Sequence, residues 1–129
     1  MSYQKAARKY LESLNASGYG CYIPLCSDPG LGQGVYEIDL VGGALRLFEK
    51  GLAVELKQKK VDVLYGDISK ITSHLSAAVF SKASATRSVN VSIPLEICFS
   101  EEVLVFEVHL LIYSRMVIVL NELWQGSKS

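Results

Sequence analysis

Apolar residues two positions apart form three short runs within Ala44–Ile71, and each run ends in a polar break too short to hold a helix. The alternating residues are Leu45 and Leu47, then Leu52, Val54 and Leu56, then Val61, Val63 and Tyr65. A two-residue period is typical of strands with one buried face. Parallel strands need a long crossover connection, which the breaks Lys50-Gly51 and Lys57-Gln58-Lys59-Lys60 cannot supply. The segment therefore predicts an antiparallel meander.

Further strands are predicted on both sides of this meander. Val35–Val41 precedes it, and Gly42-Gly43 supplies the turn between them. Asp67–Ile71 ends the meander. The runs that follow are Thr72–Phe80, Val89–Phe99 and Val103–Ile112, with Ser100-Glu101-Glu102 as a tight hairpin between the last two. About seven strands are enough to build a strongly bent sheet around one core.

Amphipathic helices are predicted at both ends of the chain. In Tyr3–Leu14 the apolar residues fall three and four positions apart, and Gly18 supplies a stop that accepts a positive φ. Near the C-terminus, Ser114 can cap a helix over Ser114–Gln125. The β-branched run Val117-Ile118-Val119 favours a strand there instead. We favour the helix, because the apolar spacing in this region changes from two to three and four.

Two segments of small residues interrupt the pattern. Residues 18–34 are rich in Gly and Pro and are expected to form a connector, with a short extended piece at Cys21–Leu25. Ser81–Ser88 is expected to be an exposed, mobile loop. A chain of 129 residues, half of them hydrophobic, is expected to fold as one α+β domain. Its parts are the N-terminal helix (1–17), the connector (18–34), and the sheet with the C-terminal helix (35–125).

Three short patterns lie at the strand boundaries. They are Gly51-Leu52 before apolar residues at a strand start, the polar turn Gln58-Lys59-Lys60, and the step Asp67-Ile68-Ser69-Lys70-Ile71. With the order of the elements, Val35–Gln125 resembles the pleckstrin-homology-like barrel superfold, in particular its bacterial and GRAM-type members. The resemblance implies an antiparallel barrel or bent sheet whose open end is plugged by the C-terminal helix through Trp124. That superfold serves lipid binding, peptide binding and structural docking, so it does not select a function.

Composition narrows the range of partners and compartments. Thirteen basic residues balance thirteen acidic ones, whereas nucleic-acid binders usually carry net positive charge, so no nucleic-acid partner is expected. No uninterrupted apolar segment is long enough to span a bilayer, and the basic N-terminal residues are not followed by a signal-peptide core. We therefore expect a cytoplasmic protein. There, Cys21, Cys26 and Cys98 act as small hydrophobes without metal-ligand spacing, and a Cys21–Cys26 disulfide is the alternative.

The residues with catalytic potential do not form a recognisable motif. Gly30–Gly34 has the glycines of a phosphate loop, but a strand follows where such a loop needs a helix, so we interpret it as an entry loop. His74 and His109 are interpreted as structural or surface residues, and Cys98 as a core residue. No catalytic, metal or cofactor site is predicted. An enzyme would require His74 or His109 to share a pocket with a carboxylate or with Cys98.

The best basic cluster is formed by Lys57, Lys59 and Lys60, with Lys50 as a further candidate. On one hairpin these lysines could meet lipid phosphates or an acidic protein surface. The alternative is a solvated turn whose lysines protect a sheet edge. No aromatic residues alternate with them, which gives single-stranded nucleic-acid binding little support.

The leading functional hypothesis is a non-catalytic protein-binding module without cofactors, such as a bacterial adaptor or an immunity protein that neutralises a toxin. The alternative is a domain that binds phosphoinositides or anionic membranes through Lys50, Lys57, Lys59 and Lys60. The first helix is the most plausible partner surface, because its apolar stripe must be buried. Packing on its own sheet is favoured there, and a homodimer or another partner is the alternative.

Overall fold

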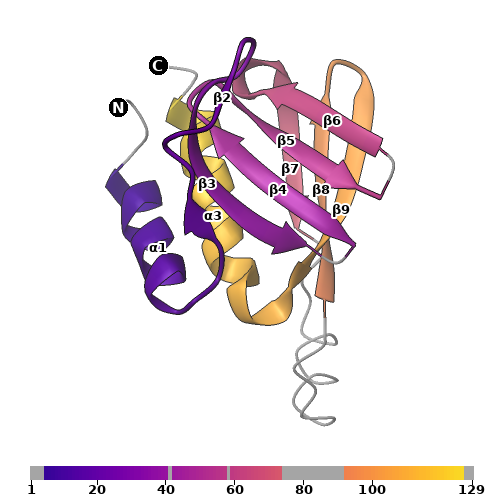
Figure 1. The fold of residues 1–129 in the computed structure, drawn as a ribbon. Helices are drawn as coiled ribbons and strands as arrows, with labels where there is room; N and C mark the ends of the chain where they lie inside the picture. Colours follow the sequence, from indigo (N-terminus) through magenta and orange to yellow (C-terminus); the bar gives the residue numbers. More distant parts are fainter. Residues whose placement is uncertain (1–4, 41, 58, 74–91, 127–129) are drawn as a thin grey trace, which may run out of the picture.

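The computed structural model describes residues 5–40, 42–57, 59–73 and 92–126 (Figure 1). Two antiparallel sheets share one hydrophobic core with two helices, one at each end of the chain. This confirms the predicted α+β class with a bent antiparallel sheet and terminal helices. No strand of one sheet pairs with a strand of the other within these ranges, so the bent sheet is open and does not close into a barrel.

The first sheet confirms the meander. Its strands are β1 (Cys21–Tyr22), β2 (Ser27–Asp28), β3 (Gly32–Leu40), β4 (Gly43–Phe48), β5 (Gly51–Leu56) and β6 (Lys59–Leu64). They follow the order β1-β3-β4-β5-β6, and β2 also pairs with β3. Val54 pairs with Leu45 on one side and with Val61 on the other, so the alternating apolar residues form rows across one buried face. The strand expected from Val35 begins at Gly32, because Gly32 and Gln33 pair with β2.

The second sheet has the order β7-β8-β9. A 3-10 turn, η1 (Tyr65–Asp67), connects β6 to β7 (Ile68–Ser73), and β8 (Ser92–Phe99) and β9 (Glu102–His109) complete the sheet. The prediction that Asp67–Ile71 only ends the meander was wrong, because β7 already begins at Ile68. At this corner the buried Tyr65 hydroxyl donates to the Phe48 carbonyl at 2.8 Å, which ties the turn to β4. Residues 74–91 lie outside the described part of the chain. This range contains His74, the expected loop Ser81–Ser88, most of the predicted strand Thr72–Phe80 and the first three residues of the predicted strand Val89–Phe99.

The N-terminal helix, α1 (Lys5–Ala16), ends in the turn expected at Gly18. The Tyr19 amide donates to the Leu14 carbonyl at 2.9 Å, and the Gly18 amide donates to Asn15 at 3.2 Å. These two bonds form a Schellman motif, which requires a left-handed residue at Gly18, and Gly18 has a φ of 84°. Ala7, Leu11 and Leu14 are fully buried, and α1 packs against the C-terminal helix. The apolar stripe of α1 is therefore buried within the chain.

The C-terminal helix is confirmed, but its predicted start was wrong. It is α3 (Leu110–Gly126), four residues longer than expected at its N-terminal end, and β9 stops at His109. The residue before the helix is His109, whose Nδ1 accepts a hydrogen bond from the Leu111 amide at 3.3 Å. His109 therefore takes the capping role assigned to Ser114. The β-branched run Val117–Val119 stays helical, because tertiary packing outweighs its intrinsic preference for strand.

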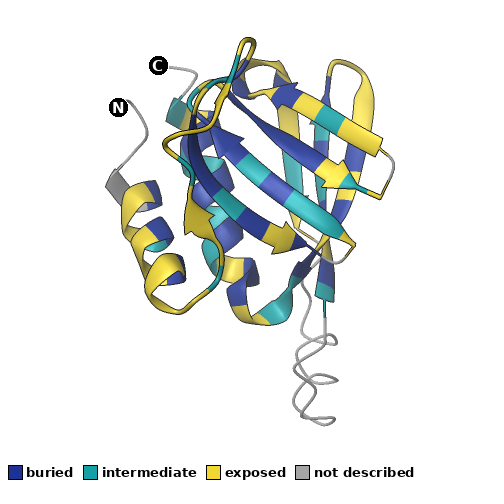
Figure 2. Ribbon diagram, in the orientation of Figure 1, coloured by how far each residue is buried: buried dark blue, intermediate teal, exposed yellow. Residues whose placement is uncertain are grey.

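Trp124 anchors α3 to the corner between the sheets. Its side chain is only 9% exposed, and its indole Nε1–H donates to the Ile68 carbonyl at 3.0 Å. The other residues of α3 that share the core are Ile112, Tyr113, Met116, Val119, Leu120 and Leu123. This burial agrees with the expected role of Trp124 as an aromatic plug. Figure 2 shows further buried segments along α3 and along the strands that it packs against.

Replacing Trp124 with Ala should lower the free energy of unfolding by about 3–5 kcal/mol, because a large buried aromatic leaves a cavity. The Ile68 carbonyl also loses its donor. Gln125→Ala is the control, since Gln125 is exposed, and we expect it to change stability by less than about 0.5 kcal/mol. Urea unfolding followed by circular dichroism measures both. Equal midpoints for the two variants, or red-shifted wild-type tryptophan emission, would contradict the plug.

Candidate functional site

The structure divides the predicted lysine cluster. Lys57, Lys59 and Lys60 lie together at the hairpin between β5 and β6. Lys50 lies in the turn between β4 and β5, at the opposite end of the six-residue strand β5. At about 3.3 Å per residue, that length puts Lys50 about 20 Å from the other three. Including Lys50 in the cluster was therefore wrong.

One of the remaining lysines, Lys60, lies beside acidic residues. Lys60 pairs across the strands with Glu55, and its Nζ lies 4.0 Å from the Asp62 carboxylate. On the same sheet face, Arg46 forms ion pairs of 2.7 Å with Glu37 and 2.9 Å with Glu55. This face is a mixed-charge surface, and it lacks the uniform positive potential that attracts an anionic lipid layer.

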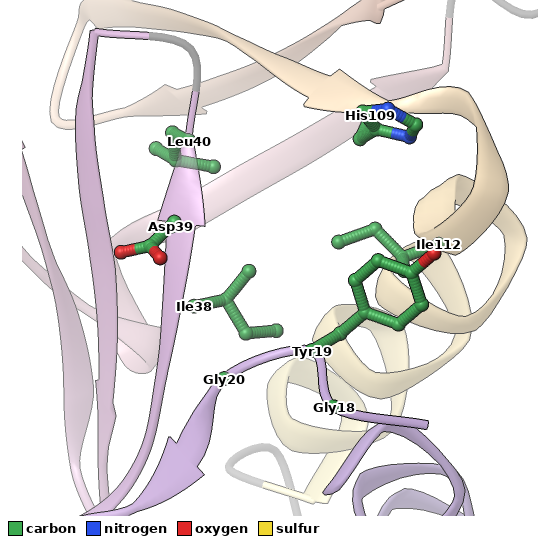
Figure 3. A pocket seen from close by; sticks show the side chains of 8 residues that line it. All are labelled: Gly18, Tyr19, Gly20, Ile38, Asp39, Leu40, His109 and Ile112. Atoms are coloured by element: carbon green, nitrogen blue, oxygen red, sulfur yellow. The ribbon is translucent and has the colours of Figure 1, made fainter. Parts of the chain in front are cut away.

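A pocket of about 270 Å³ lies where the connector, the end of β3 and the start of α3 meet (Figure 3). Its lining residues are Gly18, Tyr19, Gly20, Ile38, Asp39, Leu40, His109 and Ile112. Ile38, Leu40 and Ile112 contribute aliphatic side chains. Among the sites proposed from the sequence, only His109 lines it, so the structure reveals a site that the sequence motifs did not.

Tyr19 forms a wall of this pocket that is fixed from several directions. Its carbonyl accepts a 2.6 Å hydrogen bond from the Tyr36 hydroxyl, and the Arg115 guanidinium lies over its ring, 5.8 Å from the centroid. Arg115 in turn donates to Ser13 of α1 at 3.1 Å and to the Leu111 carbonyl at 3.1 Å. Because one cation links α1, Tyr19 and α3, this side of the pocket is preformed.

Gly20 has a specific steric role beside Tyr19. A Cβ at this position would lie 2.2 Å from the Glu37 carbonyl oxygen and 2.8 Å from the Tyr36 ring. Gly20 also has a φ of 84°, which side-chain-bearing residues rarely adopt. The Gly18-Tyr19-Gly20 sequence is therefore the local signal that brings Tyr19 against the end of β3. From the sequence, Gly18 is expected to stop the first helix, and Tyr19 and Gly20 are expected only to belong to a connector.

His109 brings a ring nitrogen to the pocket in a defined tautomer. Since its Nδ1 accepts the Leu111 amide proton, the neutral imidazole carries its own proton on Nε2. Nε2 is then a hydrogen-bond donor. The lone pair of the neutral ring is on Nδ1, where it already accepts the Leu111 amide at the start of α3. His109 is therefore suited to donate a hydrogen bond to a bound group and poorly suited to act as a general base.

Asp39 and His109 share this pocket, which is the condition that the sequence set for considering an enzyme. Asp39 is exposed between the buried residues Ile38 and Leu40, so its carboxylate leaves the opposite face of β3 and lies at the rim. A carboxylate that orients a catalytic imidazole must hydrogen-bond to it. The imidazole nitrogen Nδ1 instead contacts the Leu111 amide. This geometry supports binding better than acid–base chemistry.

The three cysteines do not contribute to the pocket. Cys21 lies opposite Glu37 on β3, whereas the Cys26 carbonyl accepts from the Gly34 amide, three residues further along the same strand. That offset is about 10 Å, beyond the Cα separation of a disulfide, and both cysteines are free. The prediction that Cys98 is a core residue was wrong in part. Cys98 is half-buried, and its thiol lies 3.8 Å from a Glu96 oxygen.

The structure also bears on the remaining sequence candidates. Gly32 and Gln33 belong to β3 and no helix follows them, so Gly30–Gly34 does not have phosphate-loop geometry. Among the described residues, no three His, Cys, Asp or Glu side chains gather in a group able to hold a metal ion. Comparisons with models of known protein families and with curated protein sequences give no match.

The Tyr36 hydroxyl makes the pocket wall and the fold sensitive to alkaline pH. Burial raises the pKa of Tyr36 from its usual value of 10.0 to about 12, with a smaller contribution from Tyr22. The unfolded chain therefore loses this proton before the folded protein does. The stability that depends on the protonated hydroxyl is complete below pH 10 and is lost as the pH rises toward 12. Burial also raises the pKa of Tyr65, which adds a change of the same sign.

We expect the free energy of unfolding, measured by urea titration at a series of pH values, to fall between about pH 10 and pH 12. Tyr36→Phe should be less stable than wild type at neutral pH, because the Tyr19 carbonyl loses its donor. The variant should also lose less stability over the alkaline range. An alkaline decline in Tyr36→Phe as steep as that of wild type would rule out this role for Tyr36.

Proposed function

We propose that this protein is a non-catalytic protein-binding module that holds an apolar side chain of its partner in the pocket beside Tyr19 and His109. The pocket is the observation that carries the proposal. It is preformed, it is lined by three aliphatic side chains, and its polar groups are few and lie at defined positions. Protein interfaces gain most of their affinity from a few anchor side chains buried in such pockets.

The size of the pocket favours an anchor side chain over a free metabolite. Sites for drug-sized ligands measure about 300–1,000 Å³, and an apolar cavity of about 150 Å³ already holds benzene. A pocket of about 270 Å³ therefore accommodates one aromatic or branched aliphatic side chain. The Nε2–H of His109 can then contact a polar group that flanks this side chain in the partner.

The fold is compatible with this role. A meander packed on a second antiparallel sheet, with a C-terminal helix at the open side, supports assignment to the pleckstrin-homology-like superfold. Members of that superfold bind peptides and proteins as well as lipids, so a docking role fits the architecture. The concrete forms we propose are a cytoplasmic bacterial adaptor or a toxin-neutralising immunity protein.

Indole should occupy the pocket with an affinity near millimolar, since a ligand of this size gains about 4 kcal/mol when well buried. Heteronuclear NMR should show shifts of the Gly18, Gly20 and His109 amides. Tyr19→Ala removes the wall and should weaken binding, whereas Leu25→Ala truncates an exposed side chain outside the lining and should not. Shifts spread evenly over the surface, or equal binding of indole by both variants, would show that the pocket does not bind an apolar side chain.

The same pair of variants tests the physiological partner. In affinity purification from the native source, wild type and Leu25→Ala should retain a stoichiometric protein that Tyr19→Ala loses. Circular dichroism of each variant must show an intact fold. If no protein depends on Tyr19 at near-native concentrations, the pocket does not carry the function.

The membrane alternative now rests on Lys57, Lys59 and Lys60 alone. Within the described part of the chain, no helix has the length and hydrophobicity needed to cross a bilayer. Because Glu55 and Asp62 lie beside Lys60, we expect no flotation with phosphatidylserine or phosphoinositide vesicles at low salt. Flotation that salt reverses, and that Glu substitution of the three lysines abolishes, would replace our proposal with lipid binding.

A further inference from the structure

We infer that the outer edge of β9 is a second docking site, which takes an extended, positively charged segment of a partner protein as an added strand. β9 is the last strand of the β7-β8-β9 sheet, and no described strand pairs with its outer edge. In Figure 1 the β8–β9 hairpin stands at the right rim of the molecule. Such an edge presents unpaired backbone donors and acceptors that an incoming strand can satisfy.

The other sheet edges carry features that discourage added strands. β6 bears Lys59, Lys60 and Asp62, all exposed. The pairing of β7 shifts register between Ile68 and Lys70. On the remaining edge, β1 and β2 have only two residues each. Charges, bulges and short strands are the usual means by which proteins protect edges.

β9 is neither bulged nor short, and the exposed charged residues on it are Glu102 and Glu107. Its eight residues pair with β8 without a register shift, and it contains no Lys, Arg or Pro. Val103 and Val105 point outward from the sheet and are 61% and 47% exposed. Exposed β-branched residues on a regular edge strand favour pairing with another strand. Among the described sheet edges, β9 is therefore the one that has no basic residue, no register shift and no short length.

The hairpin that carries β9 has a regular two-residue turn. Its two turn residues, Ser100 and Glu101, have φ values of 44° and 66°, and Phe99 pairs directly with Glu102. Two positive φ angles are typical of a type I′ turn, whose twist matches that of the flanking strands. Because the hairpin is already ordered, an added strand would not need to order it first.

Charge identifies the kind of partner. Residues 92–109 contain Glu96, Glu101, Glu102 and Glu107 but no Lys or Arg, although the whole chain is neutral. A second copy pairing through β9 would bring two such hairpins together, and like charges facing each other are destabilising. A segment that alternates Lys or Arg with apolar residues would complement the glutamates and cover Val103 and Val105. The charge pattern thus favours a basic partner strand over a homodimer.

The docking site is confined to the first half of β9. The strand turns toward β3 near its C-terminal end, where His109 and residues 38–40 line the pocket. Glu102–Phe106 is the part away from this junction. The edge site does not depend on occupation of the pocket, so the two proposals can fail separately.

The test uses a blocked peptide of about eight residues that alternates Lys with Val and Thr, and a control peptide with Glu in place of each Lys. Fluorescence anisotropy should show binding of the Lys peptide that weakens with salt, and at least tenfold weaker binding of the Glu peptide. Amides of Glu102–Phe106 should gain protection from hydrogen exchange. Equal affinity for both peptides, or protection elsewhere only, overturns the proposal.

Val103→Lys/Val105→Lys places repelling charge on the edge and should weaken Lys-peptide binding at least tenfold. Leu64→Lys is the matched control on β6, where Leu64 is 41% exposed, and it should bind like wild type. Tyr19→Ala should also bind like wild type, which separates this site from the pocket. If the double variant binds the peptide normally, the edge is not the site. If wild type dimerises through β9 in analytical ultracentrifugation and the double variant is monomeric, the occupant is a second copy and the proposal is wrong.

Discussion

The packing of α3 against the open side of the bent sheet is the contact on which the rest of the structure depends. Two antiparallel sheets without a shared strand pair leave their core open at one side, and α3 fills it with residues from Ile112 to Trp124. Trp124 hydrogen-bonds to the corner at Ile68, and α1 then covers the outer surface of α3. Arg115 joins this second layer to the first through Ser13 and the Tyr19 ring. The apolar stripe of α1 is thus used for packing within the chain.

This arrangement explains the position of the pocket. The chain must pass from α1 to β3 and from β9 to α3 at the same corner, and neither transition fills the corner completely. Tyr19 approaches from one side because Gly18 and Gly20 allow the backbone to turn. His109 approaches from the other because it ends β9 and caps α3. The candidate site therefore forms where secondary structure elements end, where side chains are least engaged in regular pairing.

The sequence predicted those parts of the fold that periodicity controls. Leu45, Val54 and Val61 repeat at strand spacing, and the structure places them in one row. The start of α3 was missed because Leu110–Tyr113 continues the apolar run of β9, so that only the His109 side chain marks the boundary. The pocket could not be predicted for a similar reason. Tyr19, Ile38 and His109 are far apart in the sequence, and only the register of β3 and the docking of α1 bring them together.

The net charge of the chain does not show how charged residues are distributed over the fold. The sequence is neutral, which argues against nucleic acid as a partner, but neutrality says nothing about how charges are distributed. The hairpin of β8 and β9 contains four glutamates and no basic residue, so the other residues carry thirteen basic and nine acidic side chains. Lys60 at the β5–β6 hairpin lies beside Glu55 and Asp62, whereas Glu102 and Glu107 belong to a strand whose outer edge is paired by no described strand. The more distinctive electrostatic surface is therefore the acidic one, although the basic cluster is easier to recognise in the sequence.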